Sequence, residues 1–495
     1  MFLRIEHKIL STALAAIAVI LLLSTFYIDF ESGKIEAFQS WLNTNYGWLT
    51  ILLPNIFFIF LIGLYFSKSS SIRIGGENAS PEFSFITWIS MLFSAGLGIG
   101  LVYYGVAEPI LHYSNPPPWG NEAYQEIDGS NQAMIFTLLH WGLHGWVIYA
   151  CMALMLAYFH FNLNKPLRMS SLLVGVLPKS KLLFNAIDVF TLIAISFGIA
   201  TSLGLGALQI TSGIANYTTD IEPSLLLTLL VILFVTIIGF ISTVTGLNKG
   251  IKILSQVNIS LSLILWLFIL IAGPTIFLLK ETLENPLSYV RFLPEATLWI
   301  EGKDSNNWQI GWTIFYYSWW ISWAPFVGMF IARISFGRTI KEFILAVVLI
   351  PTFMVILWFS VFGNAALFFE TSYGEIAKII SDDPALSLFA LLEGYPFYTL
   401  TGLLSLFIIV IFFVTSSDSG AFIAATISSK PALDEIKLPP SKSMRALWSF
   451  LFGIVAAILL YIGGLQALQI SVVMAAFPIG LLMILGLVNF IKKLN

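Results

Sequence analysis

Three tryptophans within one apolar stretch are the most distinctive chemical feature of the sequence: Trp319, Trp320 and Trp323. On an α-helix, residues three or four apart are neighbours, so Trp323 shares a face with each of the other two. Several indole faces around a small cavity bind a cation that cannot donate hydrogen bonds, such as a quaternary ammonium group, with about 0.5–2 kcal/mol of cation–π attraction per ring. The alternative is ordinary core packing of large aromatic side chains.

A second aromatic set lies in the stretch that contains Trp141 and Tyr149. These two residues are eight apart, a little over two helical turns, and therefore lie on neighbouring parts of one side. Two aromatic sets in one chain, one of them beside Pro325, favour a cation cage over simple packing.

Polar and ionisable residues inside apolar stretches are the other candidates for chemistry. The run Thr415–Gly420 holds six consecutive small or polar residues, which is costly in a membrane unless they line a site. Hydroxyl oxygens there can bind sodium, together with carbonyls of unwound backbone. The alternative is that these hydroxyls bond back to their own helix carbonyls.

His140 and His144 are four apart, a spacing that can bind a metal ion, but no third ligand is evident. We therefore expect them to be hydrogen-bonded packing residues, and we do not expect a metal-dependent membrane enzyme. Glu108 precedes Pro109, and it is expected to be a structural carboxylate or, alternatively, a proton-coupling group. Asp418 has a structural role or a cation role.

The composition requires these residues to be positioned by membrane helices. The 495 residues are 58% hydrophobic and 10% charged, with a mean hydropathy of +0.89, far from the balance of soluble proteins. The net charge of −3 and the single cysteine offer no basis for nucleic-acid binding or a disulfide framework. Apolar runs predict twelve transmembrane helices, at 10–30, 49–67, 85–112, 133–161, 184–214, 224–246, 253–279, 309–334, 342–369, 397–427, 444–464 and 468–490.

Charge asymmetry gives the orientation of these spans. One side carries 19 of the 24 lysines and arginines and the other carries 5, so the first side is expected to be cytoplasmic. Both termini then lie in the cytoplasm, and the protein is a multi-pass component of the cell (inner) membrane. The apolar stretch Ile9–Leu23 is expected to be a retained span, and Arg333, Arg338 and Lys341 to contact anionic membrane lipids.

Matching interruptions suggest two repeats. Gly96, Gly98 and Gly100 alternate in the third span, and glycine destabilises a helix by about 1 kcal/mol relative to alanine. Five spans later, Pro325 predicts a kink or an unwound turn. Spans 3–7 and 8–12 are then two five-helix halves of opposite orientation. The expected organisation is two prefix helices (1–82), a first repeat (83–280), an extracellular amphipathic connector (281–308) and a second repeat (309–495).

Six motifs of this chain occur in the same order in one known family. They are Met91–Gly100, Gly105–Pro109, His140–His144, Ala200–Gln209, Trp312–Phe330 and Phe413–Ser419. On these motifs the chain resembles the betaine/choline/carnitine transporter family, from about Phe83 to Phe490. Two departures are Gly145, where proline is expected, and Tyr317, where tryptophan is common.

The resemblance implies an all-α, sodium-symporter-like (LeuT-like) fold of inverted five-helix repeats, assembled as a homotrimer. It implies roles for three groups of residues. The substrate-binding residues would be Trp319, Trp320, Trp323, Trp141, Trp146, Tyr149 and Phe315. The sodium ligands would be Thr415 and Ser416, with carbonyls near Ser94, Leu97 and Phe412. A possible second cation site would involve Thr201, Ser202 and Phe326.

The sequence thus predicts a transporter, not an enzyme, that imports a trimethylammonium compound such as glycine betaine. Sodium is the expected coupling ion, and no other cofactor is expected. Within carriers, proton-coupled choline uptake and sodium-independent carnitine/betaine exchange remain alternatives. A channel-like or sensory membrane protein is a more distant one, because a deep cage holds its ligand too tightly for fast conduction.

Overall fold

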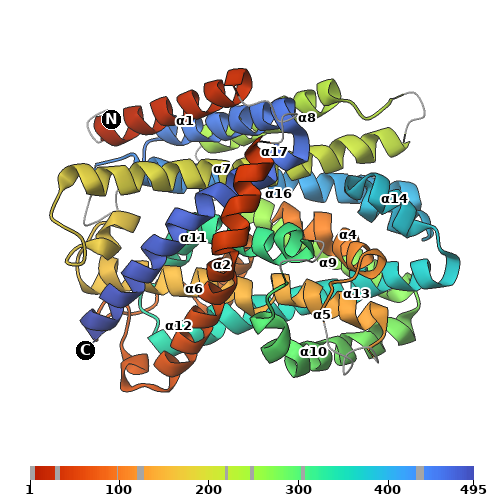
Figure 1. Ribbon diagram of the computed structural model, residues 1–495, viewed down its shortest axis with the longest axis horizontal. Helices are drawn as coiled ribbons and strands as arrows, with labels where there is room; N and C mark the ends of the chain where they lie inside the picture. Colours follow the sequence, from red (N-terminus) through yellow and green to blue (C-terminus); the bar gives the residue numbers. More distant parts are fainter. Residues whose placement is uncertain are drawn as a thin grey trace.

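The computed structural model describes residues 6–27, 34–96, 98–119, 127–217, 221–245, 250–302, 307–430 and 440–494 (Figure 1). In these residues the chain is a bundle of helices without any β-strand, and only isolated bridges such as Arg73 with Thr339 occur. The longer helices are α1 (His7–Tyr27), α2 (Lys34–Phe66), α3 (Phe85–Gly96), α4 (Ile99–Ser114), α5 (Gly129–Trp141), α6 (Leu143–Ala157), α7 (Lys181–Tyr217), α8 (Leu225–Thr245), α9 (Gly250–Ala272), α10 (Thr275–Leu298), α11 (Phe315–Ile334), α13 (Ile350–Tyr373), α16 (Tyr398–Ile427) and α17 (Lys442–Leu494). The shorter ones are η2 (Lys68–Ser71), η4 (Tyr158–Asn162), η5 (Met169–Leu173), η6 (Ile310–Ile314), α12 (Ile340–Ile344), η7 (Leu345–Leu349), α14 (Ile376–Asp382), η8 (Pro384–Leu386) and α15 (Ser387–Glu393). The all-α membrane prediction is confirmed.

Nine helical segments of the described residues are long and apolar enough to cross a membrane. Some predicted spans do not appear among them as single helices. Helices α3 and α4 are short, and α17 contains non-helical backbone at Gly463 and Gly464, where the eleventh and twelfth spans were expected to part. The number of twelve spans stays a prediction, as do the repeat boundaries.

The third predicted span is broken, as its glycines indicate. Helix α3 ends at Gly96 and α4 begins at Ile99, with Gly98 in an extended conformation at φ −130° and ψ −157°. The fourth predicted span is also broken, at Gly142, and this was not expected. A Cβ atom on Gly142 would lie 2.5 Å from the carbonyl oxygen of Leu138, so the close approach requires glycine there.

Two further predictions, for Pro325 and for the connector, agree with the structure only in part. Helix α11 runs through Pro325 without interruption, so of the two outcomes expected at this proline the unwound turn does not occur. The connector does contain a helix, α10, which begins at Thr275 rather than near 281. Leu283, Leu287 and Val290 are exposed along it, as an amphipathic surface helix requires. Its place at the membrane surface stays a prediction.

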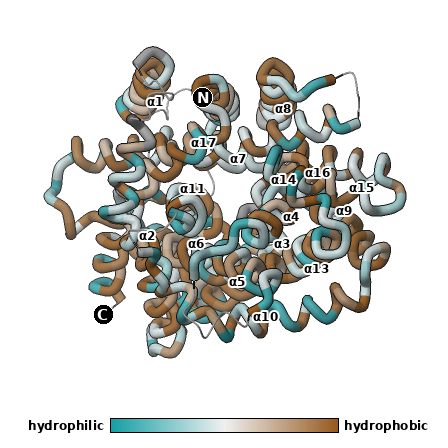
Figure 2. The backbone as a smooth tube through the Cα atoms, turned by 45° about the vertical axis from the view of Figure 1, so that its right-hand side comes forward, coloured by the Kyte–Doolittle hydropathy of each residue, from teal (hydrophilic) through white to brown (hydrophobic). Residues whose placement is uncertain are grey.

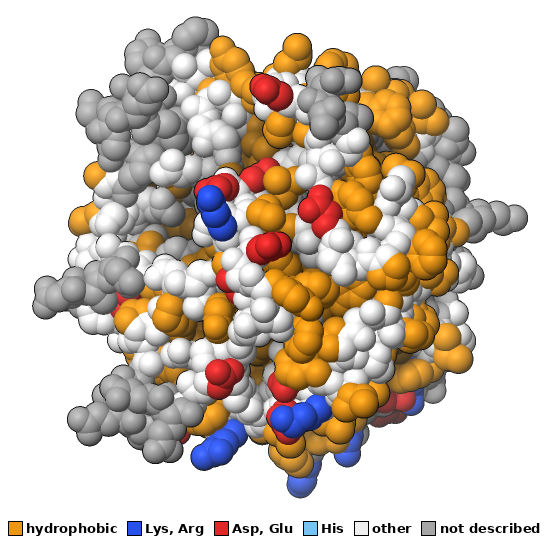
Figure 3. Space-filling view, turned by 90° about the vertical axis from the view of Figure 1, so that its right-hand side faces the viewer, with side chains coloured by type: hydrophobic (Ala, Val, Ile, Leu, Met, Phe, Trp, Pro, Cys, Tyr) orange, Lys and Arg blue, Asp and Glu red, His pale blue; other side chains and the backbone are white. Residues whose placement is uncertain are grey.

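The outside of the bundle is strongly apolar. Helices α1 and α8 lie at one edge of the molecule and α10 at the opposite edge, and hydrophobic residues dominate α1 and α8 (Figure 2). On the side shown in Figure 3, apolar side chains cover broad areas, and charged side chains form scattered groups between them and along the lower edge. Exposed Leu226, Phe234 and Ile271 would be unfavourable in water but suit contact with lipid.

Candidate functional site

Helices α6 and α11 pack against each other in the middle of the bundle and bring the two aromatic sets together. Trp320 of α11 lies against Tyr149 of α6, with ring centroids 4.8 Å apart, and against Trp141 at the end of α5, at 5.9 Å. Trp141 and Trp319 meet edge to face at 6.2 Å, and Trp319 and Trp323 at 6.3 Å. Edge-to-face contacts at such distances are favourable. The rings therefore form one continuous aromatic wall.

Glycines leave the space that these indoles occupy. A Cβ atom on Gly100 would lie 2.8 Å from the ring ends of both Trp141 and Trp319. On Gly145 it would lie 2.6 Å from Trp320. Glycine at 100 and 145 is thus explained by close approach of an indole ring.

A pocket opens between this wall and the break before α4. It contains about 340 Å³ of space free of atoms, part of which is open to solvent. Its lining consists of Gly98, Gly100, Trp141, Tyr149, Ser202, Trp319, Trp320 and Trp323. None of these side chains is charged, so aromatic faces provide the main attraction that this lining offers to a cation.

The structure separates the predicted aromatic residues into two groups. Five of them line the pocket, whereas Trp146 and Phe315 lie behind it. Trp146 packs on Trp320 at 6.0 Å, and Phe315 stacks on Trp319 at 5.8 Å with an interplanar angle of 27°. These two residues therefore buttress the rings of the pocket rather than line it.

The indole nitrogens of the pocket fall into two classes. Trp320 Nε1 donates to the carbonyl oxygen of His140 at 2.9 Å, and Trp141 Nε1 donates to Glu108 Oε2 at 2.6 Å. The Nε1 atoms of Trp319 and Trp323 are buried and have no hydrogen-bond partner in the protein. Because buried N–H groups normally have an acceptor, these two donors are incompletely satisfied within the protein, and Trp323 Nε1 lies 2.9 Å from the position that a Cβ atom on Gly198 would take.

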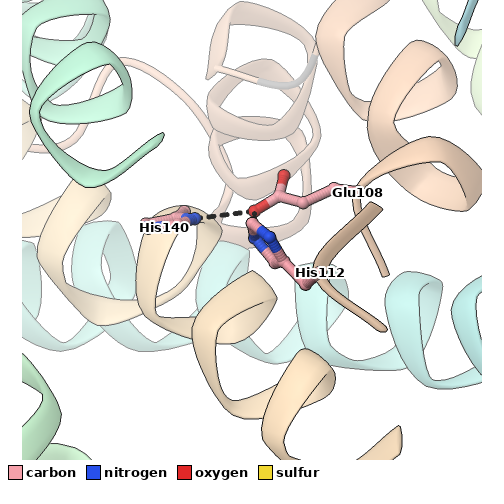
Figure 4. A group of neighbouring side chains, drawn as sticks. All are labelled: Glu108, His112 and His140. Carbon is pink, nitrogen blue, oxygen red and sulfur yellow. Dashed lines mark hydrogen bonds and ion pairs between the residues drawn. The ribbon is translucent and has the colours of Figure 1, made fainter. Parts of the chain in front are cut away.

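Glu108 is the centre of a buried cluster that the sequence did not reveal. Its Oε1 lies 2.7 Å from His140 Nδ1 and 3.1 Å from His112 Nε2. All three side chains point toward one another (Figure 4). Although their ligating atoms lie within 4.8 Å of one another, hydrogen bonds among them account for the arrangement without a metal ion. The alternating glycines predicted the break before this helix, but no pattern in the sequence indicated a contact between Glu108 and Trp141.

His140 and His144 do not form one site, because the break at Gly142 lies between them. His140 Nε2 lies 3.0 Å from Thr313 Oγ1. His144 Nε2 instead lies 2.8 Å from Thr297 Oγ1 and 3.2 Å from Asn55 Oδ1. Both histidines are thus hydrogen-bonded packing residues, as expected.

Of the residues predicted to bind sodium, Ser416 lies beside the break between α3 and α4. Ser416 Oγ is 3.6 Å from the position that a Cβ atom on Gly98 would take. Thr415 Oγ1 donates to the carbonyl oxygens of Ile411 (2.9 Å) and Phe412 (3.2 Å) on its own helix, which is the alternative that the sequence left open. Leu97 and the side chain of Ser94 lie outside the described part of the chain.

The residues of the possible second cation site face different neighbours. Thr201 Oγ1 donates to the carbonyl oxygens of Phe197 (2.9 Å) and Leu468 (3.1 Å). Ser202 lines the aromatic pocket, and Phe326 packs on Trp323 at 5.5 Å. The structure therefore associates Ser202 with the pocket.

Comparison with known proteins identifies the family. Residues 8–495 match the betaine/carnitine/choline family of transporters. The glycine betaine transporter OpuD of Bacillus subtilis is 37% identical over 93% of this chain and 89% of its own length. The glycine betaine transporter of Acinetobacter baylyi is 36% identical over 100% of this chain and 74% of its own. A glycine betaine/proline/choline/ectoine transporter of Vibrio parahaemolyticus is 38% identical over 94% and 81%.

These matches cover nearly the whole chain and most of each relative. They agree with the helical fold, the apolar exterior and the aromatic pocket. The protein is a membrane transporter and not an enzyme, and it belongs to the betaine/carnitine/choline transporter family.

Proposed function

We propose that this protein imports glycine betaine or a closely related trimethylammonium compound by sodium-coupled transport. The observation that carries the proposal is the uncharged pocket lined by Trp141, Tyr149, Trp319, Trp320 and Trp323. Aromatic faces attract a trimethylammonium group without requiring a hydrogen bond from it. The names of the relatives support the same class of substrate.

The two unpartnered indole nitrogens support a substrate that also carries an acceptor. Trp319 and Trp323 line the pocket, and their Nε1 atoms are buried without a partner in the protein, so a substrate carboxylate would supply the missing acceptor. Glycine betaine has its carboxylate one carbon away from the ammonium group. Choline offers only a hydroxyl at that end, so we expect the zwitterion to bind more tightly.

The position of Ser416 beside Gly98 supports sodium coupling. A cation bound there by hydroxyl and carbonyl oxygens would hold α16 against the break that borders the substrate pocket. Substrate and sodium would then stabilise the same arrangement of helices, which is the thermodynamic basis of coupling. Thr415 would join this site by turning its oxygen away from its own helix.

The test is uptake of labelled glycine betaine, choline and carnitine into proteoliposomes. Each is measured with an inward sodium gradient and with potassium in place of sodium. We expect accumulation of glycine betaine that requires sodium. Uptake of choline driven only by a proton gradient, or equal uptake with and without sodium through exchange, would replace this proposal by one of its two alternatives.

We propose in addition that both termini are cytoplasmic and that the protein assembles as a homotrimer. Protease accessibility of terminal tags in oriented vesicles tests the first. The mass of the purified protein, after correction for bound detergent and lipid, tests the second.

A further inference from the structure

We propose that Glu108 is a positioning residue of the transporter, which fixes the Trp141 indole in the aromatic pocket and, through its hydrogen bond to that indole, strengthens the attraction of the ring for the cationic head of the substrate. This inference rests on the proposed function, because it concerns the same pocket. It adds Glu108, which does not line the pocket but acts through Trp141, which does.

The hydrogen bonds of Glu108 hold its carboxylate in one orientation. Oε2 accepts from Trp141 Nε1 at 2.6 Å, while Oε1 accepts from His140 at 2.7 Å and from His112 at 3.1 Å. Short bonds to an ionised acceptor are stronger than those between neutral groups. Glu108 is completely buried, so water does not compete for these bonds.

The negative charge of Glu108 has no strongly basic partner. Among the described residues, no lysine or arginine lies within 4.0 Å of it, and the basic side chains that pair with it are the two histidines. His112 Nδ1 is buried without a partner, so a second proton there would leave a buried donor unsatisfied. His140 Nε2 faces the Thr313 hydroxyl, which can donate to it. Both histidines can therefore hold the carboxylate as neutral donors.

Trp141 carries the influence of Glu108 into the pocket. One end of its indole donates to Glu108, and the other end lies against the glycine surface at Gly100, beside Trp319. Rotation of this ring would alter its contacts with both Trp319 and Trp320. An anionic acceptor on the indole N–H also pushes electron density into the ring, which strengthens its attraction for a cation. The hydrogen bond between Glu108 and Trp141 thus both fixes the position of the ring and transmits the effect of the negative charge to it.

The competing explanation is that Glu108 only joins α4 to α5. In that case its loss would loosen the protein irrespective of Trp141. A double-mutant cycle separates the two explanations, because residues that act through each other give non-additive effects. Trp146→Phe is the matched control background. Trp146 lies on the neighbouring helix and packs on Trp320, but its indole nitrogen makes no hydrogen bond with the protein.

The experiment measures binding of glycine betaine to the purified full-length protein by calorimetry in sodium-containing buffer. We expect Glu108→Gln to weaken binding by about tenfold, because a neutral amide replaces the charged acceptor of the Trp141 bond. In the Trp141→Phe background, Glu108→Gln should weaken binding by less than about twofold. In the Trp146→Phe background, it should again weaken binding by about tenfold. Equal effects of Glu108→Gln in all three backgrounds would overturn the inference, as would unchanged binding by Glu108→Gln.

Two further comparisons keep the inference open to refutation. If Glu108→Gln does not yield folded protein, Trp141→Phe is compared with Trp146→Phe, and only the first loses a hydrogen bond. The first should bind more weakly, and equal affinities would overturn the inference. If the unaltered protein binds neither glycine betaine nor choline or carnitine, the proposed function fails and the inference falls with it. Binding by the unaltered protein with no effect at Glu108 removes the inference alone.

Discussion

Trp320 Nε1 donates a 2.9 Å hydrogen bond to the carbonyl oxygen of His140, which ties the aromatic face of α11 to the last turn of α5. The break at Gly142 follows immediately, so this carbonyl lies next to the end of a helix, where carbonyls lack their usual partner. The bond therefore satisfies a helix terminus and orients a pocket ring at the same time.

Replacing Trp320 separates the contribution of its aromatic face to binding from that of its hydrogen bond to His140. Trp320→Phe keeps an aromatic face but loses the bond to His140, whereas Trp320→Leu loses both. We expect weaker glycine betaine binding in both variants, with Trp320→Leu weaker by a further factor of about ten or more, as cation–π energies imply. Trp266→Phe is the control, since Trp266, on the outer helix α9, donates to the carbonyl oxygen of Leu357 on α13. Equal affinity of the two Trp320 variants would exclude a cation–π role.

Gly100→Ala should narrow the pocket directly. The added methyl group would lie 2.8 Å from the ends of Trp141 and Trp319, and overpacking of this kind costs about 1–3 kcal/mol. We expect binding of glycine betaine to weaken by about tenfold or more. Gly63→Ala on α2 is the matched control, because nothing lies within 4 Å of the added atom there. A Gly100→Ala protein with unaltered binding would show that the two rings move aside freely.

Thr415→Ala should raise the sodium concentration needed for half-maximal uptake by at least about tenfold, a change typical of losing a supporting group at a metal site. Thr415→Ser should preserve it. The control is Thr426→Ala, because Thr426 lies on the same helix and bonds back to Phe422 at 2.9 Å, much as Thr415 does to Ile411. If both alanine variants change sodium dependence equally, or neither does, Thr415 is not a sodium ligand.

Asp418→Asn should destabilise the protein rather than change its ion dependence. Asp418 is buried and pairs with Arg445 at 2.9 Å, and breaking a buried pair costs about 3–5 kcal/mol. We expect a lower thermal midpoint in detergent with unchanged sodium dependence of uptake. Lys280→Met is the control, since its pair with Glu284 at 3.3 Å is exposed and contributes little. A shift in sodium dependence without loss of stability would instead support the cation role of Asp418.

The sequence was sufficient to predict an all-α chain and five of the residues that line the pocket, because long apolar runs and closely spaced tryptophans are local patterns. The break at Gly98 was predictable from alternating glycines. The break at Gly142 was not, because the apolar run continues through it and a lone glycine is tolerated in a helix. That α11 continues through Pro325 was likewise not predictable, because it depends on tertiary packing and not on the local sequence.

Contacts between helices could not be predicted from local sequence patterns. Glu108 and Trp141 are 33 residues apart and lie on different helices. Their bond depends on the packing of α4 against α5. The same holds for Trp146 and Phe315, whose spacing suits the pocket but whose neighbours place them behind Trp320 and Trp319.

The central claim is that the aromatic pocket recognises the positive charge of a trimethylammonium group. The most direct test compares binding of glycine betaine with binding of tert-butylacetate, which has the same shape and carboxylate but an uncharged carbon in place of the nitrogen. Since several rings face the ligand, each contributing about 0.5–2 kcal/mol, we predict that tert-butylacetate binds at least about thirtyfold more weakly. Equal affinity for the two compounds would contradict the account, because the pocket would then select shape and not charge.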